Sequence, residues 1–175
     1  MNVAETLESS SEIGAAAEGS SQYLTFILAG EEYGVDILRV QEIKGWDSVT
    51  TIPNTPDYIR GVINLRGTIV PIIDLRRRFE IEAKEYGPTT VVIVLRVETK
   101  SGRERVMGIV VDAVSDVYNI DEADLKPPPD FGAGIDVDYV RGIATVQDKM
   151  IIGLDIDHLL NSGELGDIDR AVENS

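Results

Sequence analysis

The sequence predicts a mainly β protein in which two similar five-stranded barrels pack against each other, with short helices after some strands. The first observation is an internal repeat, because the segment from Tyr58 to Asp74 returns without a gap as Tyr139 to Asp155. The second is that valine and isoleucine lie in short runs bounded by turn formers, which favours strands. Each unit holds four or five such runs, too few to cover both faces of an open sheet. Closing each sheet into a barrel and pairing the barrels buries the apolar faces.

The repeated segment is predicted to form two short strands joined by a tight turn. In the first copy the turn is Arg66-Gly67, where glycine accepts a positive φ at little steric cost. Asp74 follows the second strand and is expected to cap a short helix from Leu75 to Phe79. The helix carries the run Arg76-Arg77-Arg78, which we interpret as a solvated helix face.

The first unit begins with a strand from Gln22 to Leu28. Both faces of this strand are largely apolar, so we expect it to be buried on both sides. Ala29 to Glu32 is predicted as a hairpin turn and Tyr33 to Ile37 as the returning strand. Leu38 to Ile43 fits either a helix or a strand, because periodicity does not decide over so short a run. A connection rich in turn formers, Gly45 to Pro56, leads to the repeated hairpin.

The second unit has the same order of elements. A β-branched strand from Thr89 to Val97 is followed by a charged turn from Glu98 to Glu104 and a returning strand from Arg105 to Val111. The segment Gly108 to Val117 then parallels Gly34 to Ile43. The pattern predicts a second barrel built like the first.

These units define the expected domain organisation. The first barrel unit covers about residues 22–88 and the second about 89–162, and the long connections allow strands to be exchanged between them. Residues 1–21 and 163–175 are acidic and are predicted to be flexible tails. They hold too few apolar side chains to offset the entropy of ordering.

Composition excludes several classes of protein. The formal net charge is −15, a field that repels phosphate backbones and anionic lipids. There is no cysteine, so a disulfide framework and a thiolate metal site are excluded. No apolar run reaches the roughly 18 residues of a membrane-spanning helix, and no signal peptide is recognisable at the N-terminus. We therefore expect a soluble, cytoplasmic protein with no direct membrane contact.

Candidate catalytic residues are weak. His158 is the single histidine and lies in a predicted terminal helix, so a surface or capping role is expected. The pairs Asp155/Asp157 and Asp136/Asp138 are close enough to hold a cation, but no calcium loop or phosphate loop accompanies them. We expect no enzyme activity, cofactor or metal. A metal-dependent hydrolase and a small-barrel nucleic-acid binder remain the alternatives, the second lacking the basic, aromatic groove it would need.

The two units differ in charge at one pair of positions, and this difference suggests a binding site on the surface. Glu42 and Arg66 are charged residues within otherwise apolar strings, whereas the second unit has Asp116 and Gln147 at these positions. The two residues can form an ion pair that stabilises the first barrel. Alternatively, Arg66 can recognise a partner, because a planar guanidinium offers directed donors.

Four segments of the chain, taken together, form a recognisable set: Tyr33–Gly45, Gly61–Gly67, Ile69–Leu75 and Gly108–Val117. In these segments the sequence resembles the CheW family, the coupling proteins of bacterial chemotaxis, and the resemblance covers about Gln22 to Ser162. It implies a pair of five-stranded SH3-like barrels and a non-catalytic adaptor. The adaptor would couple the cytoplasmic tips of transmembrane chemoreceptors to the regulatory domain of the histidine kinase CheA.

The resemblance also implies site residues. It places a receptor-binding groove between the barrels, formed by Val40, Glu42, Gly61, Leu65, Arg66, Val110 and Val114. Kinase-binding surfaces are expected as exposed apolar patches on both barrels, although no motif identifies their residues.

Overall fold

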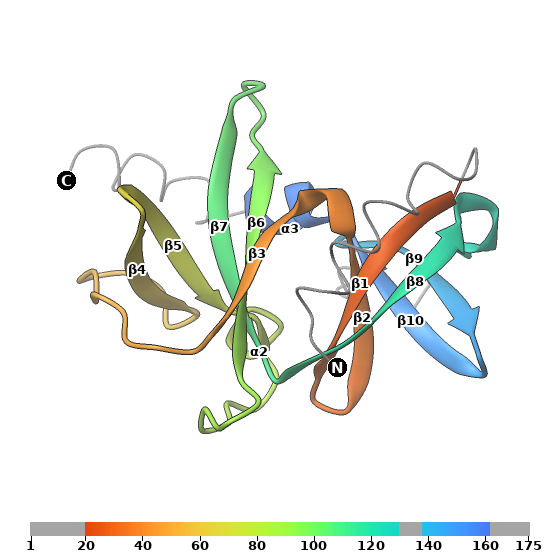
Figure 1. Cartoon of the computed structure of the whole chain (residues 1–175), viewed down its shortest axis with the longest axis horizontal. Helices are drawn as coiled ribbons and strands as arrows, with labels where there is room; N and C mark the ends of the chain where they lie inside the picture. The colour runs from red at the N-terminus through yellow and green to blue at the C-terminus, as the bar shows by residue number, and fades with distance from the viewer. Residues whose placement is uncertain (1–19, 130–137, 162–175) are drawn as a thin grey trace.

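The computed structural model describes residues 20–129 and 138–161, which form two five-stranded sheets beside each other (Figure 1). Sheet A has the strand order β8-β1-β2-β10-β9, and sheet B has the order β3-β6-β7-β5-β4. The prediction of a mainly β protein with two five-stranded modules is confirmed. Apart from Ser20 and Ser21 in the first strand, the two predicted tails lie outside the described residues, as does Asp136.

The strand bounds follow the predicted runs closely. Sheet A contains β1 (Ser20–Leu28), β2 (Glu31–Asp36), β8 (Ala113–Asp121), β9 (Val140–Val146) and β10 (Lys149–Leu154). Sheet B contains β3 (Val40–Gly45), β4 (Ile59–Leu65), β5 (Thr68–Asp74), β6 (Val91–Glu98) and β7 (Glu104–Val111). The helices are short: η1 (Ile37–Arg39), α2 (Leu75–Arg78), η2 (Glu122–Asp124) and α3 (Ile156–Asn161).

Each sheet takes strands from both halves of the chain. Strands β1 and β2 lie with β8, β9 and β10, whereas β6 and β7 lie with β3, β4 and β5. The halves are joined by four pairings: β1 with β8 and β3 with β6 are antiparallel, and β2 with β10 and β5 with β7 are parallel. The chain passes from one sheet to the other at η1 and again at Asp112. The sequence units and the sheets therefore divide the chain differently.

The internal repeat is visible in the hydrogen bonds. The amide of Asp74 donates to Tyr58 O at 2.7 Å, and the amide of Asp155 donates to Tyr139 O at the same distance. Each sheet also closes into a barrel at equivalent places. An isolated bridge joins Thr50 to Val62 between the β3 and β4 edges, and another joins Lys126 to Ile143 between the β8 and β9 edges.

Three apolar clusters hold this arrangement together. The largest lies between the sheets and combines Leu24 and Phe26 of β1 with Ile93 and Leu95 of β6, all fully buried. Neighbouring residues of β6 point the other way, into a core inside sheet B made of Leu65, Val70, Ile72, Val92, Val94 and Val110. A smaller core inside sheet A contains Tyr23, Ile120, Ala144 and Ile151. Packing between the barrels therefore buries the face that each barrel alone would leave exposed.

Two local predictions need correction. The first hairpin turn is only Ala29-Gly30, both at positive φ (52° and 81°), and Glu31 and Glu32 belong to β2. Such two-residue loops match the twist of the flanking strands. The ambiguous segment from Leu38 to Ile43 contains both structures, because η1 is followed directly by β3.

The prediction of a solvated arginine face on α2 is wrong. Arg76 makes a bidentate pair with Asp112, and the two side chains are only 15% and 19% exposed. The guanidinium of Arg78 lies over the rings of Tyr58 and Tyr139, 5.3 and 5.1 Å from their centroids. A local charge run does not reveal that another part of the chain will cover it.

The Arg76–Asp112 pair makes a prediction about acid stability. Hydrogen bonding from Arg76, and secondarily from the Ala29 amide, holds the pKa of Asp112 below its usual value of 3.8. The stabilisation is therefore complete above pH 3.8 and is lost as pH falls through the lower folded-state pKa. We expect Asp112→Asn to reduce the free energy of unfolding at neutral pH by about 1–3 kcal/mol. Urea unfolding at decreasing pH should show this difference shrinking only below about pH 3.8; a constant difference would contradict the assignment.

Candidate functional site

The candidate site lies where the edges of sheet B meet. Glu42 of β3 is opposite Val94, whose side chain lies in the core inside the sheet, so Glu42 faces the barrel opening. Arg66, in the β4–β5 turn, donates from Nη2 to Glu42 Oε2 at 2.8 Å. The ion pair considered from the sequence is therefore present, and it bridges the two edge strands.

The pair is exposed enough to remain available to a partner. The Arg66 side chain is 68% exposed and that of Glu42 29%. An ion pair of this kind contributes at most about 1 kcal/mol to stability. The turn itself is held by the Gly67 amide, which donates to Asn64 Oδ1 at 2.8 Å, with Arg66 at a φ of 50°. The turn therefore fixes the position of Arg66, and N–H groups of its guanidinium other than the one bonded to Glu42 can donate to a partner.

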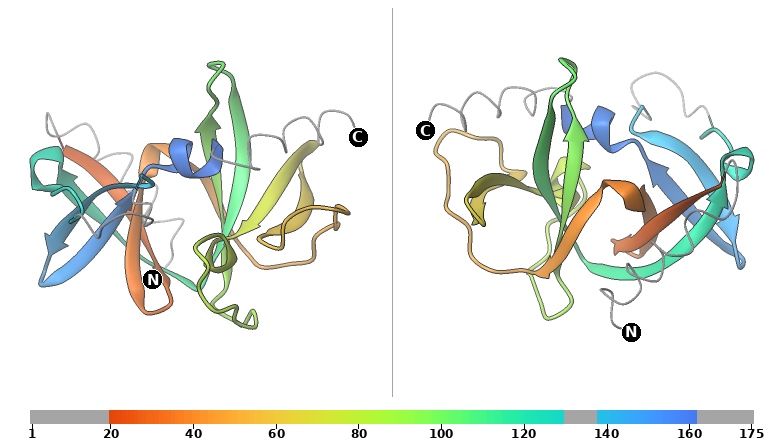
Figure 2. Two further views of the ribbon diagram at one scale, coloured as in Figure 1. Left: turned by 180° about the vertical axis from the view of Figure 1, so that it is seen from behind. Right: turned by 45° about the horizontal axis from the view of Figure 1, so that its top comes forward.

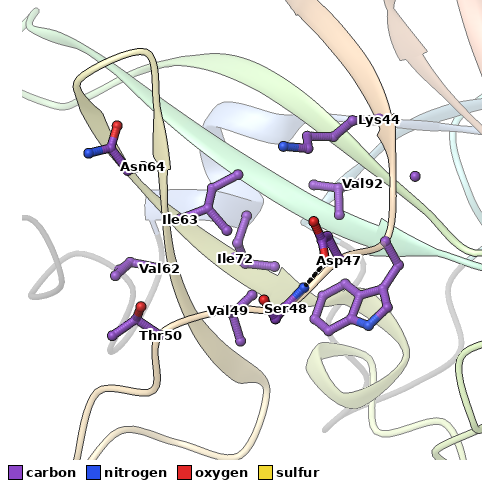
Figure 3. Close-up of a pocket in the computed structure, with 12 residues that line it drawn as sticks. Lys44, Asp47, Ser48, Val49, Thr50, Val62, Ile63, Asn64, Ile72 and Val92 are labelled. Carbon is purple, nitrogen blue, oxygen red and sulfur yellow. Dashed lines mark hydrogen bonds between the residues drawn. The ribbon is translucent and has the colours of Figure 1, made fainter.

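A cavity of about 250 Å³ lies between the connection after β3 and strands β4 and β5 (Figure 3). In Figure 3, Ile63 and Ile72 lie on one side of it and Lys44 and Val92 on the other. Its lining is mainly polar and includes Lys44, Asp47 and Asn64 beside the apolar side chains of Ile63 and Ile72. The amide of Ser48 donates to Asp47 Oδ1 at 2.8 Å, which orders the connection after β3.

The other residues of the implied receptor site lie at different depths. Val40 and Val114 are half-buried and pack against the core between the sheets. Leu65 and Val110 are only 7% and 3% exposed and belong to the core inside sheet B. These two can influence a partner only through the shape of the barrel beneath the surface.

Gly61 allows the backbone of β4 to lie close to the connection after β3. Its φ is 142°, and an added Cβ would overlap the carbonyl oxygen of Thr50. Thr50 and Val62 exchange backbone hydrogen bonds of 2.9 and 2.8 Å, which close the barrel. Glycine at this position therefore allows the connection after β3 to lie against β4.

Three large apolar side chains of the described residues are exposed, and the sequence did not identify them as exposed: Leu38 of η1 at 75%, Ile69 of β5 at 41% and Met150 of β10 at 63%. Ile69 and Met150 occupy the same position in the two copies of the repeat. Comparing the copies position by position would have shown Ile69 and Met150 to be apolar at the same place. Their exposure depends on the barrels around them, which no local pattern reveals.

The candidate catalytic residues have structural roles. Asp155 Oδ1 accepts the His158 amide at 3.0 Å and so caps α3, while the exposed His158 ring lies near Tyr139. Asp157 is paired with Arg39. Within residues 20–129 and 138–161, no three histidine or acidic side chains gather as metal ligands. In the same segments, no helix is both long and apolar enough to cross a membrane.

The fold and this site define a class, a twin-barrel scaffold that exposes a charged pair at the opening of one barrel. A family model described as "CheW-like domain" matches residues 22–164. The chain is 46% identical to "Chemotaxis protein CheW" of Klebsiella aerogenes, covering 87% of this chain and 89% of that protein. It is 35% identical to the protein of the same name in Rhizobium meliloti, covering 83% and 91%.

A solved structure agrees with these relatives. The crystal structure of the scaffolding protein TtCheW from Thermoanaerobacter tengcongensis matches with a TM-score of 0.70 and 40% identity, covering 82% of this chain and 94% of that one. This chain belongs to the CheW family, and it is a non-catalytic scaffolding protein of chemotaxis signalling.

Proposed function

We propose that this protein is a cytoplasmic adaptor that joins the tips of transmembrane chemoreceptors to the regulatory domain of the histidine kinase CheA. It holds the two partners side by side and makes or breaks no bond. Membership of the CheW family supports the role. The net charge of −15 argues against binding to nucleic acid or directly to a membrane surface.

The observation that carries the receptor-binding part is the exposed Arg66, oriented by Glu42 at the opening of sheet B. A guanidinium held by one carboxylate keeps further N–H donors for carbonyl or carboxylate groups of a receptor tip. Sheet A has Gln147 in the corresponding turn, so the charge distinguishes one barrel from the other. Val40 and Val114, half-buried against the core between the sheets, supply apolar surface to the proposed site, and Gly61, Leu65 and Val110 support it from below.

The kinase-binding part is assigned to the exposed apolar positions Ile69 and Met150. They lie on different sheets at the same place in the repeat, as expected of patches on both barrels. Burying apolar surface contributes about 25 cal/mol per Å² before the cost of association is counted.

Reconstitution tests the proposed role. Purified chain, the kinase regulatory domain and a receptor cytoplasmic fragment are mixed and separated by size-exclusion chromatography. We expect a complex that contains all three proteins, and omission of the chain should separate receptor fragment from kinase domain. A chain that binds neither partner would refute the proposal.

Arg66→Ala should weaken receptor binding about tenfold, equivalent to about 1.4 kcal/mol, because it removes charge-assisted donors from the surface. Binding to the receptor fragment is measured by calorimetry, and circular dichroism checks the fold. The matched control is Gln147→Ala, which changes the equivalent turn residue at nearly the same φ (51° against 50°). Equal losses in both variants, or loss of the fold in Arg66→Ala, would favour a purely structural role for the ion pair.

A further inference from the structure

The interiors of the two barrels differ at one pair of equivalent positions. The barrels closed by sheets A and B are called barrel A and barrel B. In sheet A, Tyr118 of β8 lies opposite Tyr23 of β1. In sheet B, Lys44 of β3 lies opposite Val92 of β6. Two tyrosines in one barrel therefore correspond to a lysine and a valine in the other.

The repeat establishes that these positions are equivalent. Tyr118 directly follows the segment from Gly108 to Val117, and Lys44 directly follows the parallel segment from Gly34 to Ile43. The strand registers agree, because the residues before Tyr118 and Lys44 also lie opposite corresponding residues of β1 and β6.

Barrel A fills its interior at this level with its own aromatic rings. Tyr23 is 1% exposed, and Tyr118 packs against the same core. The Tyr23 ring also covers two glycines, since a Cβ added to Gly34 or Gly153 would lie 3.4 or 3.8 Å from it. The side chains of the chain itself therefore occupy this space.

Barrel B has no aromatic ring at these positions. Ile72, at the repeat position of Gly153, takes the space above Gly108, because its Cδ1 would lie 2.7 Å from a Cβ added there. Val92 and Lys44 leave the rest open, and both line the cavity of about 250 Å³. The connection after β3, which borders this cavity, runs along the side of sheet B that faces away from sheet A (Figure 1, Figure 2).

The cavity has an apolar floor and a polar rim. Ile72 and Val92 belong to the buried core of sheet B and form the floor. Asp47, Ser48 and Asn64 are exposed and form much of the rim. A ligand with an apolar body and one polar end fits this arrangement. Because drug-sized ligands occupy roughly 300–1,000 Å³, a smaller molecule with one ring and a short substituent is the expected size.

Lys44 determines the charge of the polar end. It is half-buried, and Figure 3 shows its side chain extending from β3 across the cavity towards Ile63 and Asn64. Among the described residues, Lys44 has neither an ion pair nor a hydrogen-bond partner. An ammonium group offers three donors, which a carboxylate accepts in strong, charge-assisted hydrogen bonds. Asp47 lines the same rim and would repel a second carboxylate.

We propose that the cavity of barrel B binds a small aromatic monocarboxylate, with its ring on Ile72 and Val92 and its carboxylate on Lys44 Nζ. The ring takes the place that tyrosine rings fill in barrel A, and the carboxylate pairs with the ammonium group. The net charge of −15 repels anions at a distance, but physiological salt screens exposed charges beyond about 8 Å, so the contact with Lys44 decides. None of the described residues that line the cavity belongs to the proposed receptor site, and the proposal does not depend on receptor binding.

Titration with phenylacetate tests the proposal. Trp46 is the single tryptophan of the chain and lines the cavity, so its fluorescence reports binding there. We expect a saturable change with phenylacetate and about tenfold weaker binding of phenylacetamide, which has the same ring but no charge. Calorimetry of the same titrations measures the dissociation constants independently.

Two variants of Lys44 distinguish the effect of charge from the effect of space. Lys44→Met should weaken phenylacetate binding about tenfold and leave phenylacetamide binding unchanged, because it removes the ammonium group and keeps the cavity. Lys44→Tyr introduces the residue type of barrel A into the cavity and should abolish binding of both compounds. The matched control is Lys149→Met, which removes an exposed lysine of sheet A and should bind both compounds as the original chain does.

The same chemistry is present in a protein chain that ends in phenylalanine. N-acetylphenylalanine, which carries the ring and the carboxylate of such a chain end, is therefore titrated beside phenylacetate. Tighter binding of phenylacetate identifies a free acid as the ligand, and tighter binding of N-acetylphenylalanine identifies a chain end. Both results support the proposed site.

Equal affinities of the original chain for phenylacetate and phenylacetamide would overturn the proposal, as would the absence of binding in both fluorescence and calorimetry. Equal losses in Lys44→Met and Lys149→Met would also overturn it, because bulk charge would then explain the binding. Circular dichroism checks the fold of each variant, and Lys44→Met decides alone if Lys44→Tyr does not fold.

Discussion

Gly61→Ala is expected to lower the free energy of unfolding by about 3 kcal/mol or more. The new Cβ would overlap the Thr50 carbonyl oxygen and lie 2.8 Å from the Thr50 carbonyl carbon, and the φ of 142° is unfavourable for any residue with a Cβ. Thr50 cannot simply retreat, because its carbonyl accepts the Val62 amide that closes the barrel. Urea denaturation followed by circular dichroism measures the loss.

Substitutions at two other glycines distinguish the cost of steric overlap from the cost of an unfavourable φ. Gly67→Ala imposes a positive φ of 92° but has nothing within 4 Å of the new Cβ, so a loss of about 1 kcal/mol is expected. Gly142→Ala, at the repeat position of Gly61, brings the Cβ to 2.9 Å from Leu125 Cβ and should lie between these values. Similar losses at Gly61 and Gly67 would contradict the steric explanation.

Asp74→Ala is expected to cost about 3 kcal/mol, because it removes two hydrogen bonds and a 3.6 Å ion pair with Arg77 from a carboxylate that is only 3% exposed. Asp74 Oδ1 accepts the Arg77 amide at 3.2 Å and caps α2, and Oδ2 accepts the Tyr86 hydroxyl at 2.6 Å. Without the carboxylate, the Tyr86 hydroxyl loses its partner at the base of sheet B. The change in unfolding free energy is measured in urea.

The repeat again provides the control. Asp155→Ala removes only the cap of α3, so about 1 kcal/mol is expected. Burial, and then the hydrogen bond to Asp74, raise the pKa of Tyr86. Asp74→Ala should therefore move the tyrosinate titration to lower pH. An unchanged titration with equal losses in both variants would show that Asp74 acts as a cap alone.

Much of the fold could be predicted because its signals are local. The Arg66-Gly67 turn, the capping Asp74 and the apolar runs around them depend on backbone conformation and side-chain period over a few residues. Because the segment is repeated, the hairpin predicted for the first copy could also be predicted for the second. The segment from Leu38 to Ile43 was undecided for the same reason, since a 3₁₀ turn and a strand share too few residues for a period to appear.

The site was less accessible to such reasoning. The charge difference between Glu42–Arg66 and Asp116–Gln147 identified the pair, because comparing repeats is a comparison within the sequence. Exposure was not encoded locally: Ile69 and Val110 are both apolar strand residues, yet one is exposed and the other lies in a core. The same limit made the arginines of α2 look solvated when Asp112 covers Arg76.

The sequence by itself determined two β modules, their hairpins and the absence of a thiol-based site, because these follow from composition and from contacts between near neighbours. Only the tertiary structure decided that β5 lies beside β7 and β10 beside β2. Strand partners depend on contacts between residues far apart in the chain, such as Ile72 against Gly108, and a local sequence pattern does not reveal these contacts.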